Sequence, residues 1–171
     1  MARTLTLNNK GSGNWAEGWH TLKINNAKYG TWGETKYVDT WFEGYPENFN
    51  MRVYSKIGQN GEEFAIGNLY RFANAGITDA LESAEGETVI KMDDSAEALV
   101  GSTVNVYFYK DGKFSRILSQ VAPTVFKNIV EEFTDKDVEY FKNRAEASFQ
   151  KYVKPKLEEK ELVAETSDIP F

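Results

Sequence analysis

The chain has 171 residues, of which 41% are hydrophobic, and its formal net charge is −6. This length suits one domain with an appendage, and the apolar fraction suffices for a core without covalent staples. The absence of cysteine excludes disulfides and thiolate metal sites, and the single histidine, His20, leaves too few ligands for a typical zinc site.

No part of the sequence resembles a membrane or export signal. The apolar runs are shorter than the roughly 18–20 residues that cross a bilayer. The first 15 residues are too polar for a signal peptide. We therefore expect a cytoplasmic protein that does not contact a membrane.

The charge is distributed unevenly. Residues 1–60 carry seven basic and five acidic side chains, and residues 101–156 carry ten and seven. Residues 61–100 carry two and nine, and residues 157–171 carry one and five. Because the local field governs where a polyanion can bind, the two basic blocks keep nucleic acid open as a partner despite the negative total.

The first part of the chain predicts a lead-in followed by three strands. Residues 1–18 are rich in Gly and Asn and predict an irregular segment. Residues 19–30, 36–44 and 49–55 are rich in β-formers and bounded by Gly, Asn or Pro, which is typical of strands. The connector at 30–35 contains two glycines and predicts a mobile loop.

Beyond the third strand the pattern changes to a helix and then returns to strands. Apolar residues recur at helical spacing over residues 62–76, and Gly76 stands where a glycine commonly ends a helix. We expect a short strand at residues 88–92. A β-hairpin is predicted around Asp111 and Gly112.

The last third predicts a helical extension and a tail. Residues 126–156 form the extension, with Thr134 as the N-cap of its helix, Asp137 three residues later and Pro155 as the stop. Residues 157–171 are acidic and predict a flexible tail.

Three strands, a helix and at least two further strands follow the element order of a small barrel. The five-stranded Greek-key barrel called the OB-fold has a helix after its third strand, and it commonly binds oligonucleotides or oligosaccharides. We therefore expect a mainly β protein, with an OB-fold-like barrel over residues 19–125 and a C-terminal helix.

Strand alternation sends aliphatic side chains inward and an aromatic and basic set outward. A base stacked on an aromatic ring contributes about 1–3 kcal/mol, and Lys and Arg attract phosphates. The pattern predicts a face that binds single-stranded nucleic acid, formed by Trp19, Lys23, Tyr37, Trp41, Arg52, Tyr54, Tyr107 and Tyr109. Weaker candidates, in or near the predicted loops, are Lys28, Trp32, Lys36, Lys110 and Lys113.

Two other interpretations of this face stay open. The C-terminal helix or a second copy of the chain could cover the aromatic residues, as in a structural or adaptor protein. Exposed Trp and Tyr also stack on sugar rings, and Asp39, Glu43 and Asn25 could hold sugar hydroxyls in a carbohydrate-binding domain. The salt dependence of the affinity distinguishes the DNA and sugar interpretations. Binding to phosphates weakens as salt rises, whereas binding to a sugar would hardly change.

The sequence does not indicate catalysis or a cofactor. Asp93 and Asp94 lie in an acidic run at residues 79–97 that is typical of a solvated surface. We expect a non-enzymatic protein with no metal and no cofactor.

The chain ends in Asp168-Ile169-Pro170-Phe171, which resembles the C-terminal tip of bacterial single-stranded-DNA-binding proteins. In that family the tip recruits replication, recombination and repair enzymes. The resemblance implies that the Phe171 ring fills an apolar pocket of a partner while its carboxylate meets a basic residue.

The body is similar to small single-stranded-DNA-binding proteins that tailed bacteriophages encode near their recombination and replication genes. The similarity covers roughly residues 10–123 and rests on the segments GSGNWAEGWHTLKINNAKYG and ALVGSTVNVYFYKDGKFSRILSQVAP. It implies a phage protein, in the host cytoplasm, that coats single-stranded DNA without strong sequence preference. The helix at 134–153 and the lack of a long Gly/Gln-rich linker depart from these families, and the helix could serve homo-oligomerisation.

Overall fold

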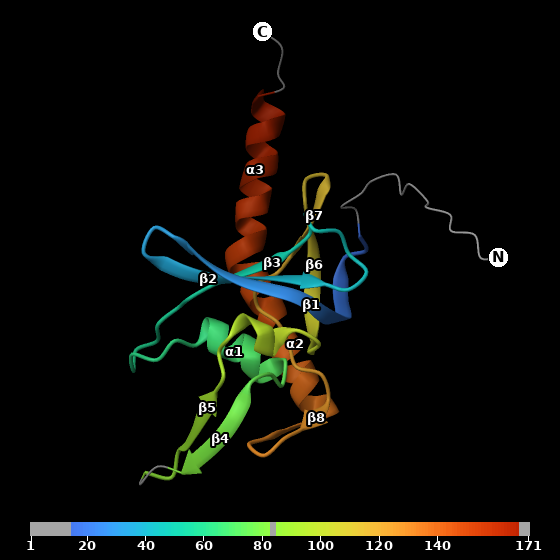
Figure 1. Cartoon of the computed structure of the whole chain (residues 1–171). Helices are drawn as coiled ribbons and strands as arrows, with labels where there is room; N and C mark the ends of the chain where they lie inside the picture. Colours follow the sequence, from blue (N-terminus) through green and yellow to red (C-terminus); the bar gives the residue numbers. More distant parts are fainter. Residues whose placement is uncertain (1–14, 83–84, 168–171) are drawn as a thin grey trace, which may run out of the picture.

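The largest element of the computed structural model is a five-stranded antiparallel sheet with the order β3-β2-β1-β6-β7 (Figure 1). The structure describes residues 15–82 and 85–167. The protein is therefore mainly β, as predicted, and its sheet consists of β1 (Gly18–Trp32), β2 (Thr35–Phe42), β3 (Met51–Tyr54), β6 (Thr103–Asp111) and β7 (Phe114–Ile117).

Strand β1 is long because it serves both halves of the sheet. Its first six residues pair with β6, and from Ile24 onward it pairs with β2. The register shifts between Ile24 and Asn26, as at a β-bulge, which exchanges the side chains that face inward. The predicted loop at 30–35 is instead mostly strand, since β1 and β2 continue to a two-residue turn in which Gly33 has a φ of 61°.

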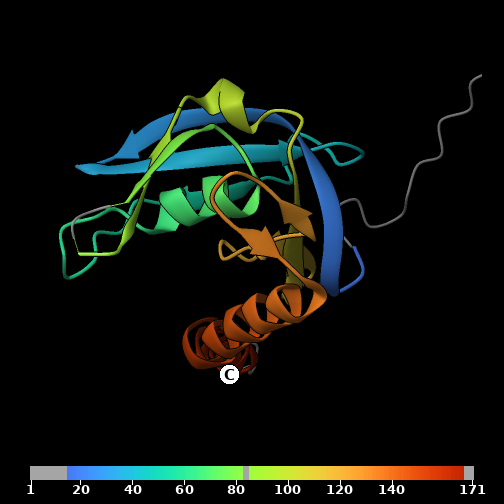
Figure 2. The same cartoon turned by 90° about the horizontal axis from the view of Figure 1, so that it is seen from below.

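The core lies between the inner surface of the sheet and helix α1 (Ala65–Phe72), which Figure 2 shows inside the curve of the β1–β2 ribbon. Helix α1 falls within the predicted segment but ends earlier, because Asn74 adopts the left-handed conformation with a φ of 53°. The buried apolar side chains of this layer include Ile24, Val38, Met51, Val53, Leu69, Tyr70 and Phe72.

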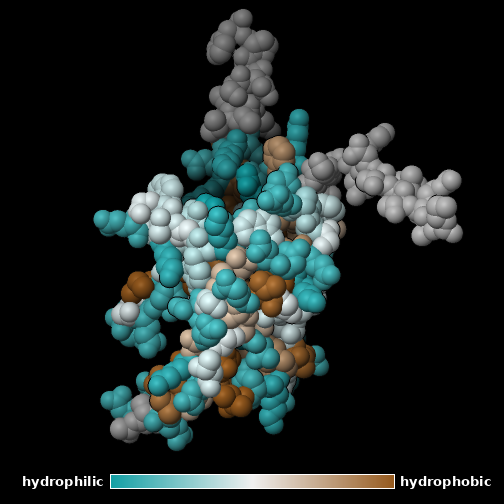
Figure 3. Space-filling view, in the orientation of Figure 1, coloured by the Kyte–Doolittle hydropathy of each residue, from teal (hydrophilic) through white to brown (hydrophobic). Residues whose placement is uncertain are grey.

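Two small hairpins lie at the lower end of Figure 1. One is formed by β4 (Ile77–Glu82) and β5 (Thr88–Met92), and the other by β8 (Phe126–Lys127) and β9 (Glu132–Phe133). Strand β5 matches its prediction, whereas β4 was not predicted. A short 3₁₀ helix, η1 (Ala96–Leu99), lies between β5 and β6 in the chain. The hairpins expose apolar side chains at this end of the molecule (Figure 3), among them Leu81, Val89 and Ile129.

The C-terminal helix is longer than predicted. It comprises α2 (Asp135–Ser148), a π-helical turn η2 (Phe149–Val153) and α3 (Lys154–Ser167). The capping box of Thr134 and Asp137 begins it as predicted. Pro155 does not end it: the Lys154 N–H bonds to the Phe149 carbonyl, and this wider turn relieves the clash that proline makes with a regular preceding turn. Residues 157–167, predicted as flexible tail, are therefore helical.

Candidate nucleic-acid interface

The outward aromatic set divides into two groups. The first group, Trp19, Tyr107 and Tyr109, packs beneath the C-terminal helix against Phe149 and its neighbours. The Phe149 ring centre lies 5.3 Å from that of Tyr107 and 5.2 Å from that of Tyr109. Burial raises the pKa of both tyrosine hydroxyls. For these three residues the helix-covered interpretation is correct, and they do not form an open stacking surface.

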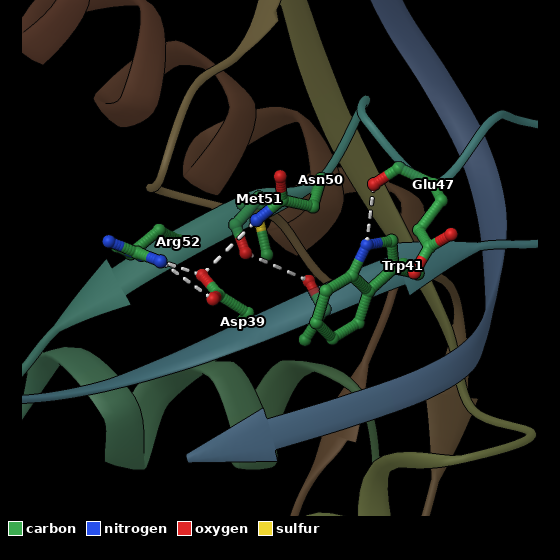
Figure 4. Close-up of polar contacts among 7 residues, drawn as sticks. Asp39, Trp41, Glu47, Asn50, Met51 and Arg52 are labelled. Atoms are coloured by element: carbon green, nitrogen blue, oxygen red, sulfur yellow. Dashed lines mark hydrogen bonds and ion pairs between the residues drawn. The ribbon is translucent and has the colours of Figure 1, made fainter. Parts of the chain in front are cut away.

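Two indole N–H groups form hydrogen bonds that fix neighbouring segments of the structure. Trp19 Nε1 donates to Glu146 Oε1 at 3.0 Å, which links β1 to α2. Trp41 Nε1 donates to the carbonyl oxygen of Glu47 at 2.8 Å (Figure 4) and so anchors the segment between β2 and β3. Trp41 is half-buried, so only part of its ring is accessible.

The second group lies on β1, β2 and β3 beyond the bulge. The cross-strand register places Lys28 opposite Asp39 and Asp39 opposite Arg52, and it places Gly30, Tyr37 and Tyr54 in the adjacent row. Trp32 ends the same side of β1, two residues after Gly30. We call the following set the open strip: Lys28, Trp32, Tyr37, Arg52 and Tyr54.

The centre of the open strip is the Tyr37 ring. A Cβ atom on Gly30 would lie 2.5 Å from Tyr37 Cζ, so the ring rests directly on the glycine backbone. The Arg52 guanidinium carbon lies 3.8 Å from the Tyr37 ring centre, and the Tyr54 ring meets Tyr37 edge-on at 5.6 Å. Tyr37 therefore supports Arg52 and Tyr54 and leaves little ring surface for a ligand.

An ion pair fixes the Arg52 side chain. Its Nε and Nη2 atoms donate to the two Asp39 carboxylate oxygens at 2.7 and 2.8 Å, and Asn50 Nδ2 donates to Asp39 Oδ1 at 3.1 Å (Figure 4). The hydrogen bonds to Asp39 raise the pKa of the guanidinium above its ordinary value. The side chain of Asp39 is 12% exposed and that of Arg52 40%. Asp39 is thus engaged by Arg52, so one of the three residues named for the sugar-binding interpretation is already paired, while Glu43 and Asn25 are exposed.

The accessible part of the open strip combines rings and cations. Trp32 is 72% exposed, Tyr54 is 38% exposed, and Lys28 is also exposed. Two accessible rings on the same side of the sheet as a lysine and an oriented guanidinium can stack bases and attract phosphates.

The other predicted lysines lie apart from the open strip. Lys23 is exposed on β1 before the bulge, opposite Thr103 of β6. Lys36 faces the other side of the β1–β2 hairpin, with its Nζ 4.5 Å from the Tyr29 ring centre. Lys110 Nζ donates to Ser115 Oγ at 3.0 Å. Lys113 is exposed at the β6–β7 turn, and the predicted tip at residues 168–171 lies outside the described residues.

An open pocket of about 440 Å³ joins the open strip to the other edge of the sheet. Arg52 and Tyr54 of β3 line one side, Tyr109 and Arg116 line the other, and Val153 of the π-helical turn also borders it. The sequence did not identify Arg116, because both parities of its strand carry apolar residues. Arg116 Nε bonds Asp111 Oδ2 at 2.7 Å, and this bond holds the pKa of the Asp111 carboxyl below its usual value.

Comparison with protein-family models, curated proteins and solved structures gives no match for this chain. Within the described residues, no helix is long and apolar enough to cross a membrane. In the same part of the chain, no three His, Asp or Glu side chains are grouped as metal ligands would be. The geometry of the site and the sequence resemblance therefore carry the functional argument.

Proposed function

We propose that this chain is a non-enzymatic single-stranded-DNA-binding protein with an OB-fold-like body. The strand order β3-β2-β1-β6-β7, with α1 after β3, supports that fold, because β3 and β7 are then the strands that a closed barrel would join. Both edges border the same pocket. The open strip lies on the first three strands, the part of an OB-fold that commonly binds oligonucleotides.

The observation that carries the proposal is the exposure of Trp32 and Tyr54 beside Lys28 and Arg52. Bases stack on aromatic rings regardless of their identity, so this arrangement suits binding without sequence preference. Phosphates interact with the cations. The Asp39 carboxylate partly neutralises the charge of Arg52 and fixes the orientation of its guanidinium.

A second part of the proposal rests on the sequence alone. Residues 168–171 resemble a recruitment tip, and we propose that they bind a replication, recombination or repair protein while the open strip holds DNA. A phage origin belongs to the same proposal and rests on the resemblance of residues 10–123.

Fluorescence titration with oligo-dT tests the DNA-binding proposal. The parent should show quenched Trp emission, and its affinity should fall as salt rises. Trp32→Ala should remove much of the quenching and weaken binding by about 1–3 kcal/mol, because one stacking ring is lost. Ile129→Ala, which truncates a similarly exposed apolar residue in the β8–β9 hairpin, is the control and should bind like the parent. Absence of quenching at low salt would refute the proposal, and an affinity for oligo-dT that does not change with salt would show that the cations do not contact phosphates.

A further inference from the structure

The middle of the C-terminal helix carries a concentrated positive charge. Residues 140–156 contain five Lys or Arg side chains and one acid, Glu146. Directly afterwards, Glu158, Glu159 and Glu161 reverse the sign. The basic segment therefore ends sharply, one turn after the π-helical turn.

This basic segment borders the pocket beside the open strip. Val153 lines the pocket together with Arg52, Tyr54 and Arg116. Lys156 follows Val153 by three residues, which places it on the same side of the helix, whereas Lys154 and Lys151, one residue after and two residues before Val153, lie on other sides of the helix. A ligand that extends from the open strip past β3 into the pocket therefore reaches this part of the helix next.

The three lysines at residues 151–156, which span the end of the π-helical turn and the start of α3, can contact a ligand. Lys151, Lys154 and Lys156 are exposed, and the ion pairs within residues 15–82 and 85–167 are formed by other cations. Tyr152 is 59% exposed, and Lys151 Nζ lies 5.2 Å from its ring centre. The turn thus repeats the chemistry of the open strip, an accessible ring among cations.

We propose that residues 151–156 form a second contact for single-stranded DNA. A strand bound on the open strip crosses the pocket between β3 and β7, and its phosphates then meet Lys156 first and, around the helix, Lys154 and Lys151. This inference rests on the proposed function. The exposed rings favour a nucleic-acid strand over an acidic protein segment, because Tyr54 on β3 and Tyr152 on the helix accompany the cations and bases stack on such rings.

The test compares two triple variants that remove the same charge. Lys151→Ala/Lys154→Ala/Lys156→Ala changes the turn, and Lys91→Ala/Lys127→Ala/Lys136→Ala changes exposed lysines on β5, β8 and α2. Each is titrated at several salt concentrations with oligo-dT of about 4 to 16 nucleotides, the range of site sizes for OB folds. Melting temperatures equal to that of the parent confirm that both variants are folded.

For the longer oligonucleotides, the turn variant should flatten the slope of log K against log salt by up to about 2, since each phosphate contact contributes about 0.7. For the shortest ones, which fill the open strip alone, it should match the parent. The control triple should match the parent at every length. Lysine acetylation gives an independent readout, because bound oligo-dT should protect Lys151, Lys154 and Lys156 but not Lys91 or Lys127.

Three results would overturn the inference. If the turn variant keeps the parent slope at all lengths while Trp32→Ala still weakens binding, the helix does not touch DNA and the proposed function stands. If both triple variants flatten the slope of log K against log salt equally, the lysines act through the overall electrostatic field of the protein and not through direct phosphate contacts. If the parent does not bind oligo-dT, the proposed function and this inference fail together.

Discussion

At the scale of single residues, the open strip depends on a glycine. Tyr37 lies flat because Gly30, directly opposite it, has no side chain, and the ring then supports the Arg52 guanidinium at 3.8 Å. The Asp39 carboxylate fixes the same guanidinium from the side. Arg52 is therefore oriented before any ligand binds, which lowers the entropy that binding must overcome.

Gly30→Ala should destabilise the protein. Its methyl group would overlap the Tyr37 ring, and overpacking of this kind costs about 1–3 kcal/mol. Gly67→Ala in α1 is a matched control, because its Cβ would meet nothing nearer than 3.7 Å and alanine favours a helix by about 1 kcal/mol. Urea unfolding should show a loss of stability for the first variant and a gain for the second. A gain for both would show that Tyr37 does not rest on Gly30.

At the scale of elements, the C-terminal helix covers part of the sheet. Phe149, with Ala145 and Leu118, fills a small cluster of its own beside the main core, and Trp19, Tyr107 and Tyr109 pack against it. The π-helical turn begins at Phe149 and lets the helix pass Pro155 without a break. The helix therefore acts as a covering element over one half of the sheet and as a wall of the pocket beside the other half.

Phe149→Ala should lower the free energy of unfolding by about 3 kcal/mol, because it removes the ring on which two tyrosines pack. At this chain length the melting temperature should fall by about 2–4 °C for each kcal/mol. Tyr152→Ala, which removes an exposed ring from the same turn, should leave melting nearly unchanged. Equal effects of the two variants would contradict the packing role of Phe149.

The sequence predicts elements better than their contacts. The three N-terminal strands, the helix after them, the Asp111-Gly112 hairpin and the Thr134 cap follow from local patterns, and the structure confirms them. Strand β4 was missed because its residues, ITDALE, show neither clear alternation nor a run of β-formers. Pro155 misled the prediction because a π-helical turn is not visible in a local pattern.

Strand alternation likewise has a limit in predicting the site. It gives the outward direction of Tyr37, Arg52 and Tyr54 correctly, but it cannot tell that a helix much further along the chain covers Trp19 and Tyr107. The bulge between Ile24 and Asn26 exchanges the faces of β1, so Lys28 and Trp32 join the open strip although they were assigned to loops. Coverage and bulges depend on tertiary contacts, which a single sequence does not display.

At the scale of the whole molecule, charge and packing are both uneven. The open strip and the turn at 151–156 are basic, whereas the β4–β5 hairpin and residues 158–171 are acidic. Helix α3 contacts mainly the π-helical turn before it, and Lys160 reaches Asp111 Oδ2 at 3.5 Å. An exposed ion pair at that distance contributes about 0–1 kcal/mol, so most of α3 adds little to the stability of the body.

Ending the chain after Leu157 should therefore leave the melting temperature within about 2–4 °C of the parent, which corresponds to about 1 kcal/mol. The removed residues hold five acids and one base, so the formal net charge changes from −6 to −2. Affinity for oligo-dT should rise modestly at low salt, because a repulsive field near the phosphates is removed. The gain should vanish near 1 M salt, where the Debye length is about 3 Å and only direct contacts act. A chain ending after Ser148, which also lacks Phe149, should melt far lower; equal melting of the two truncations would mean that the covering helix does not stabilise the sheet.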